Sequence, residues 1–130
     1  FGDTPLWNSI ARGNRAVVRA LLRAGANPNL AHEDHGGRTP LLAAVEGGHL
    51  RIVKRLLKAG ALPNGADEEG TTPLMVVEDV EIARALLERG AQRGARNRAG
   101  QTALDIARQE GRGEIAQLLE GRAGAEAAGA

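Results

Sequence analysis

One sequence motif occurs four times along this chain, and it constrains the fold more than any bulk property does. Each copy opens with Thr-Pro-Leu or Thr-Ala-Leu, and the four openings are Thr4, Thr39, Thr72 and Thr102. Successive openings lie 35, 33 and 30 residues apart. Self-similarity at such a period indicates one supersecondary unit per copy, stacked so that neighbouring units bury a continuous core. The repeat therefore predicts a solenoid over nearly the whole chain.

Each copy encodes a pair of helices. Thr is a favoured N-cap residue and Pro fits the first turn of a helix, so Thr39-Pro40 predicts a helix start. Gly48 can take the left-handed conformation that ends this first helix, as can Gly13 and Gly111 in other copies. The second helix has a stripe of apolar residues, which are Leu50, Val53, Leu56 and Leu57 in copy two. A Gly-Ala pair then ends it and leads into a projecting loop.

The sequence motif of these copies is similar to that of the ankyrin repeat family. The second copy runs Thr39-Pro40-Leu41-Leu42-Ala43-Ala44 and then Gly48-His49, against the family's T-P-L-H-x-A at a period of about 33 residues. The resemblance implies an all-α solenoid of stacked helix-turn-helix units with projecting β-hairpin-like finger loops. We expect an ankyrin repeat domain over residues 1–120, with repeats at about 1–34, 35–66, 67–96 and 97–120. Residues 121–130 form an Ala/Gly segment that we expect to be a flexible tail.

The copies differ in ways that bear on function. The third copy lacks three residues around Val76-Val77-Glu78-Asp79, so we expect its first helix to shrink to about one turn. Ankyrin-type inhibitors of cyclin-dependent kinases also resemble the chain in carrying a shortened first helix, although theirs lies in the second repeat. The finger Leu30–Arg38 is two residues longer than the others. The fourth copy, with Asp105 in the family's His slot, resembles a terminal repeat, whereas the first lacks the polar outer face of a cap.

Composition and charge exclude several classes of partner. The net charge is +1 and aromatic residues make up 2% of the chain, so bulk attraction to nucleic acid or a membrane is not expected. Residues 1–63 carry nine Lys/Arg against four Asp/Glu, whereas residues 64–130 carry eight against twelve. Much of the basic excess falls on expected second helices, at Arg15, Arg19, Arg23, Arg51, Lys54, Arg55 and Lys58. A solvated outer face explains this pattern, and so does a surface that orients an oppositely charged partner or stacks head to tail.

The sequence contains no recognisable catalytic arrangement. The chain has no Cys or Tyr, and its one Ser, Ser9, occupies a slot where the family packs Ala. His32 and His35 flank two carboxylates and could in principle bind Zn²⁺. Their finger offers no scaffold for a tetrahedral site, however, so we expect a solvated or partner-contacting loop. His49 matches the Gly-His of the family and is expected to be structural. We predict neither an enzyme nor a cofactor or metal site.

Ankyrin repeats vary at the finger tip before each Thr and at the end of each first helix, so these slots are the candidate partner-binding residues. In this sequence they hold Asp3, Ala11, Arg12, His35, Arg38, Glu46, Gly47, Glu68, Glu69, Thr71, Arg98, Gln101, Gln109 and Glu110. Trp7 fills the His slot of the first copy, either packing between first helices or serving as a binding anchor.

The resemblance implies a non-enzymatic module that binds a protein or peptide on the concave face of the repeats. We expect it to be a monomer without nucleic-acid or membrane partners, intracellular and most often cytoplasmic as in most of the family. Two alternatives stay open. One is a regulatory inhibitor of an enzyme such as a kinase, acting through the shortened third repeat; the other is a structural segment of a longer repeat array.

Overall fold

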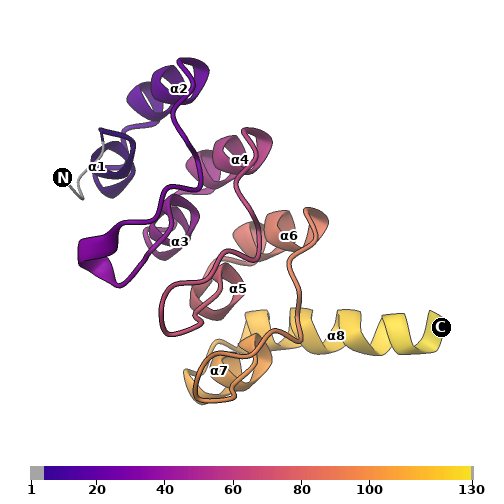
Figure 1. Ribbon diagram of the computed structural model, residues 1–130. Coiled ribbons are helices and arrows are strands. Elements are labelled where there is room, and N and C mark those ends of the chain that lie inside the picture. The colour runs from indigo at the N-terminus through magenta and orange to yellow at the C-terminus, as the bar shows by residue number, and fades with distance from the viewer. Residues whose placement is uncertain (1–4, 130) are drawn as a thin grey trace.

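A computed structural model of the chain describes residues 5–129, with side chains described as far as Gly121. The helices form four consecutive pairs: α1 (Pro5–Ala11) with α2 (Arg15–Arg23), α3 (Pro40–Glu46) with α4 (Leu50–Lys58), α5 (Pro73–Val76) with α6 (Val80–Glu88), and α7 (Ala103–Gln109) with α8 (Gly113–Gly129). Figure 1 shows α1, α3, α5 and α7 stacked as an inner row beside an outer row of α2, α4, α6 and α8. No strand occurs within residues 5–129, so the all-α solenoid is confirmed.

The inner helices begin where the sequence predicts. The Thr39 hydroxyl accepts a hydrogen bond from the Leu42 amide at 3.1 Å, and the Thr102 hydroxyl accepts one from the Asp105 amide at 3.2 Å. These bonds satisfy amides that lack a partner within the helix. Thr4, the opening of the first copy, lies outside the described residues.

Glycine ends the longer inner helices, also as predicted. Gly13, Gly48 and Gly111 follow α1, α3 and α7 with φ of 68°, 70° and 71°. Residues with a Cβ atom rarely adopt this left-handed backbone conformation, because the Cβ atom crowds the backbone there. In these three repeats the outer helix can therefore start at once and run back along the inner one.

The third repeat is shortened at its inner helix, as expected. α5 has four residues, and Val77 after it is extended at φ −72° and ψ 136°. Arg112 of the fourth repeat reaches this end of α5, where its guanidinium donates to the Met75 carbonyl at 3.0 Å. The same guanidinium lies 3.7 Å from the Glu78 carboxylate. Arg112 thus supplies a partner to a carbonyl that a longer helix would have satisfied itself.

One core extends through all four repeats. The outer helices contribute Val18, Ile52, Leu56, Ile82, Leu86 and Leu119, none more than 1% exposed. The inner helices meet them from the other side with buried residues such as Ile10, Leu41 and Leu74. Adjacent repeats therefore share apolar contacts, and this packing fixes the position of each finger.

Two asparagines join successive repeats outside the core. The Asn29 side chain donates to the Gly60 carbonyl at 3.1 Å and accepts from the Leu62 amide at 2.8 Å. The Asn64 side chain repeats this pattern one unit later, donating to the Gly90 carbonyl at 3.1 Å and accepting from the Gln92 amide at 2.7 Å. Each amide group thereby holds the turn that ends the next outer helix.

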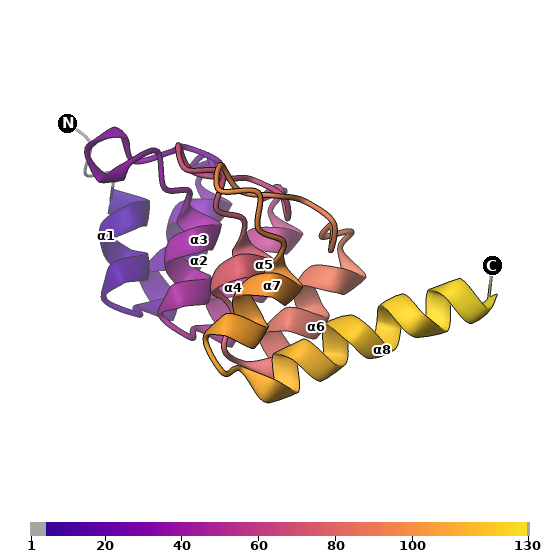
Figure 2. The ribbon, with the colours of Figure 1, turned by 90° about the horizontal axis from the view of Figure 1, so that it is seen from below.

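The C-terminal helix is longer than the sequence suggested. We expected the array to end near Glu120, but α8 continues to Gly129 and projects past the other helices (Figures 1 and 2). The added segment is rich in Ala, the residue with the highest intrinsic helix propensity, which explains why the helix continues. The flexibility of residues 121–130 stays a prediction.

Candidate partner-binding surface

The three fingers, which span residues 30–38, 65–71 and 95–101, lie along one side of the helix rows (Figure 2). A backbone hydrogen bond joins the first finger to the second, from the Glu68 amide to the Gly36 carbonyl at 2.9 Å. Another joins the second to the third, from the Arg98 amide to the Glu69 carbonyl at 2.9 Å. The finger tips therefore form one connected surface, and their side chains have fixed neighbours.

Two of the fingers are closed by the same side-chain turn. The Asp67 carboxylate accepts from the amides of Glu69 and Thr71, both at 2.9 Å. Asn97 does the same in the third finger, where its side-chain oxygen accepts from the amides of Ala99 and Gln101 at 3.0 Å. Asp and Asn favour such turns because their short side chains reach backbone amides two residues on. Thr71 and Gln101 consequently hold the base of a finger.

The first finger closes differently because His32 occupies the place of Asp67 and Asn97. The His32 amide donates to the Arg38 carbonyl at 2.7 Å, and the short 3-10 helix η1 (Glu33–His35) fills the two-residue insertion. Trp7 of α1 lies under this loop, with ring centroids 4.5 Å from His32 and 5.0 Å from His35. Trp7 thus packs against the first finger.

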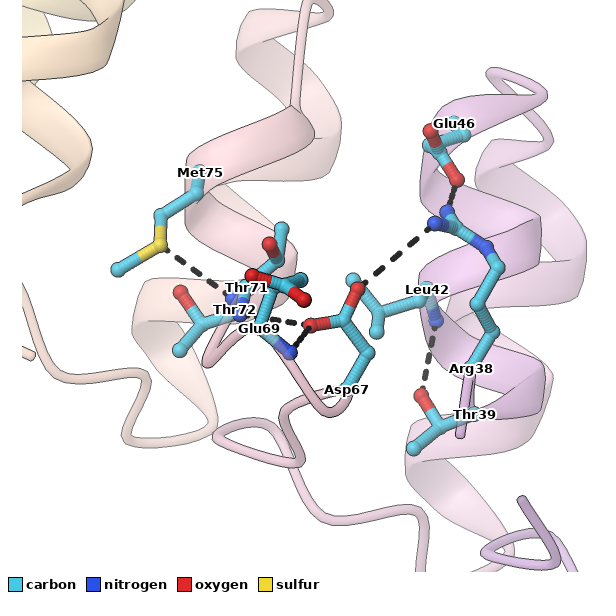
Figure 3. Close-up of polar contacts among 9 residues, drawn as sticks. All are labelled: Arg38, Thr39, Leu42, Glu46, Asp67, Glu69, Thr71, Thr72 and Met75. Carbon is cyan, nitrogen blue, oxygen red and sulfur yellow. Dashed lines mark hydrogen bonds and ion pairs between the residues drawn. The ribbon is translucent and has the colours of Figure 1, made fainter. Parts of the chain in front are cut away.

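Arg38 links two repeats. Its guanidinium forms an ion pair with Glu46 at the end of α3 and lies 3.9 Å from the Asp67 carboxylate of the second finger (Figure 3). Arg38 and Asp67 are both largely covered, with 23% and 10% of their side chains exposed. Less exposure strengthens such an interaction relative to one in open solvent. Two candidate residues, Arg38 and Glu46, are thereby joined in one contact.

A similar contact ties the third finger to α7. The Gln101 side-chain amide donates to the Gln109 side chain at 2.9 Å, and its oxygen accepts from the Asn97 side chain at 3.1 Å. Gln101 and Gln109 were both predicted site residues. They are brought together, and Gln109 keeps an exposed surface.

The ankyrin repeat model, described as "Ankyrin repeats (3 copies)", matches residues 1–67 and 48–127. These overlapping matches span nearly the whole chain. The chain belongs to the ankyrin repeat family. No curated protein sequence matches it at a significant level. Ankyrin repeats generally serve as protein–protein interaction modules and are typically non-enzymatic.

The ankyrin framework accounts for two polar residues noted in the sequence, Ser9 and His49. Ser9 is buried and its hydroxyl donates to the Pro5 carbonyl at 2.7 Å, consistent with a structural role. His49 precedes α4, and a Cβ added at Gly13 or Gly47 would lie 2.9 Å or 2.6 Å from its ring. Its imidazole therefore fills the space between the turns of the first two repeats.

Asp105 forms a capping box at the start of α7. Its carboxylate accepts from the Thr102 amide at 3.0 Å, reciprocating the bond that its own amide makes to the Thr102 hydroxyl. The bond from the Thr102 amide, followed by the Thr102 hydroxyl, holds the pKa of Asp105 below its ordinary value of 3.8. Asp in the family's His slot thus serves the helix start.

The remaining candidates present exposed side chains. Ala11 and Arg12 lie at the end of α1, and His35 is exposed although its ring contacts Trp7. Glu68, Glu69 and Arg98 lie at the finger tips and Glu110 at the end of α7. Asp3 lies outside the described residues. The structure therefore separates candidates that hold the fingers from candidates that a partner could reach.

The described part of the chain holds neither a metal-binding cluster nor a membrane-spanning helix. No group of three or more His, Cys, Asp or Glu side chains there could hold a metal ion. No helix there is both long and apolar enough to span a bilayer. Sequence reasoning missed Arg112, Asn29 and Asn64, which hold repeats together, although the spacing of the two asparagines follows the repeat.

Proposed function

We propose that this chain is a protein-interaction module that binds a protein or peptide across its connected fingers and the ends of its inner helices. The observation that carries the proposal is the pair of backbone hydrogen bonds that join the three fingers. They hold exposed polar side chains in fixed relative positions before a partner arrives. Such preorganisation lowers the entropic cost of association.

Glu69 and Arg98 form the centre of this surface. The carbonyl of one accepts from the amide of the other, so their opposite charges lie on adjacent finger tips. Both residues are exposed, and neither forms an ion pair with another described residue. Arg38, by contrast, is paired with Glu46 and Asp67, so changing it would disturb the framework as well as the surface.

The test is a charge swap that keeps net charge constant. The double variant Glu69→Lys/Arg98→Glu reverses the charge pattern at the finger tips. The matched control Lys54→Glu/Glu88→Lys makes the same exchange on exposed residues of α4 and α6. Complementary charges across an interface raise binding specificity. Placing like charges opposite each other costs several kcal/mol, which lowers affinity about a hundredfold or more.

Immobilised wild-type chain and both variants would be used to capture proteins from the native lysate, followed by mass spectrometry. We expect proteins that bind wild type and the α4/α6 control but not the finger variant. Circular dichroism must show equal helicity in all three. If the finger variant still captures every protein that wild type captures, the fingers are not the binding surface.

A second candidate function, inhibition of an enzyme such as a kinase, is supported by the short α5. Its end exposes Glu78, whose side chain is 76% exposed beside the largely covered Arg112. Inserting three residues after Val76 would lengthen α5 and displace Glu78 from its present position. Loss of inhibition in the insertion variant, with a matched insertion after Gly100 still inhibiting, would favour this function. Equal inhibition by both would exclude α5 as the contact.

A further inference from the structure

The outer face of the first two repeats is strongly basic. α2 and α4 carry seven basic residues and no acidic one, the basic residues being Arg15, Arg19, Arg23, Arg51, Lys54, Arg55 and Lys58. Neither α6 nor the described side chains of α8 show this pattern, since Glu81, Glu88, Glu114 and Glu120 occur there. The excess therefore belongs to one pair of neighbouring helices.

Four of these side chains line a groove between α2 and α4. Arg15 and Arg19 form one wall and Arg51 and Arg55 the other, around a cavity of about 250 Å³. Residues four apart lie on the same face of a helix, so each wall presents two guanidiniums in line. Val18 and Ile52 contribute an apolar floor that is almost fully buried.

The groove lacks an internal counter-charge. No acidic residue lines it, and none of its four arginines forms an ion pair with a described residue. Like charges at this spacing repel one another, so an anion between the walls would relieve the repulsion. The groove uses Arg throughout, whereas both lysines of α4 lie outside its lining. Guanidinium binds phosphate or carboxylate through paired hydrogen bonds that an ammonium group cannot form.

A second groove in the same protein serves as an internal comparison. Between α6 and α8 the corresponding cavity is lined by Arg84, Leu87, Glu88 and Leu118. It holds one Arg and one Glu, and Arg84 already lies 3.4 Å from Glu81. Stacking outer helices therefore does not by itself produce a groove lined by four arginines.

We propose that the α2/α4 groove binds a compact anion carrying two or more phosphate groups. Its volume is close to the lower limit for small-molecule sites, about 300 Å³, which suits a ligand that is dense in charge. No aromatic residue lines it, so it offers phosphate coordination without the stacking that nucleobases use. The site lies on the opposite side of the repeats from the inner helices and does not depend on the proposed protein-binding function.

The test is isothermal titration calorimetry with inorganic tripolyphosphate as the probe. The groove variant Arg19→Gln/Arg51→Gln removes one guanidinium from each wall. The control Arg23→Gln/Lys58→Gln removes the same charge from the last residues of the same helices, outside the groove. Because hydrogen bonds to charged groups are the stronger class, we expect the groove variant to bind about tenfold more weakly or worse, and the control within about twofold of wild type.

Three results would overturn the proposal. The first is the absence of binding to wild type at near-physiological salt. The second is equal weakening of both variants, which would show diffuse attraction and no site. The third is binding of a polyglutamate peptide as tight as that of tripolyphosphate, which would assign the groove to an acidic protein segment. Circular dichroism of each variant establishes that it is folded.

Discussion

The asparagine contacts between repeats support a prediction about stability. Replacing Asn64 by Ala removes the donor to the Gly90 carbonyl and the acceptor for the Gln92 amide. A protein hydrogen bond contributes about 0.5–1.5 kcal/mol net, so two would contribute about 1–3 kcal/mol. Both bonds lie near solvent, which can replace them in part. We therefore expect Asn64→Ala to lower the free energy of unfolding by about 1–2 kcal/mol.

Urea denaturation followed by far-UV circular dichroism measures this loss directly. Asn8→Ala is the matched control, since Asn8 is exposed on α1 and Ala is a better helix former there. For a chain of this size the midpoint of thermal unfolding should fall by about 3–8 °C in Asn64→Ala and not in Asn8→Ala. An unchanged free energy in Asn64→Ala, or an equal loss in the control, would refute the argument that Asn64 couples the repeats.

Two further predictions concern the fourth repeat. Arg112→Ala leaves the Met75 carbonyl without its donor and should cost about 1 kcal/mol in urea unfolding, whereas Arg112→Lys should recover part of it; no loss in Arg112→Ala would contradict the capping role. Asp105→Asn should lower the thermal midpoint at pH 7, because a depressed carboxyl pKa stabilises the fold above the unfolded-state pKa. That difference should shrink progressively as the pH falls from about 3.8 through the lower folded-state pKa of Asp105, and a difference that does not change with pH in this acidic range would contradict it.

The helices and their lengths could be predicted because the relevant interactions are local. Thr39 caps a helix three residues on, Gly48 ends the same helix, and the missing residues after Val76 shorten α5 whatever else the chain does. The continuation of α8 past Glu120 was not predicted, although the high Ala content of that segment favours helix.

The candidate surface was harder to predict because its contacts cross between repeats. Arg38 and Glu46 both occupy variable slots, but the sequence does not show that they pair with each other and with Asp67. One sequence signal could have drawn attention to Arg112. It precedes the outer helix of its repeat, where the other repeats have Asn14, His49 and Asp79, and Arg is not a favoured N-cap residue. No sequence signal could have placed Trp7 against the first finger, because that contact depends on the fold of η1.

The proposed function requires a partner to contact the fingers and not the outer face. Photo-crosslinking tests it most directly, with a photoreactive benzophenone amino acid in place of Glu69 in one sample and in place of Lys54 in another. Both positions are exposed, one on a finger tip and one on α4. We predict that irradiation with the captured partner yields an adduct from position 69 and none from position 54. An adduct from position 54, or the lack of one from position 69, would contradict this assignment.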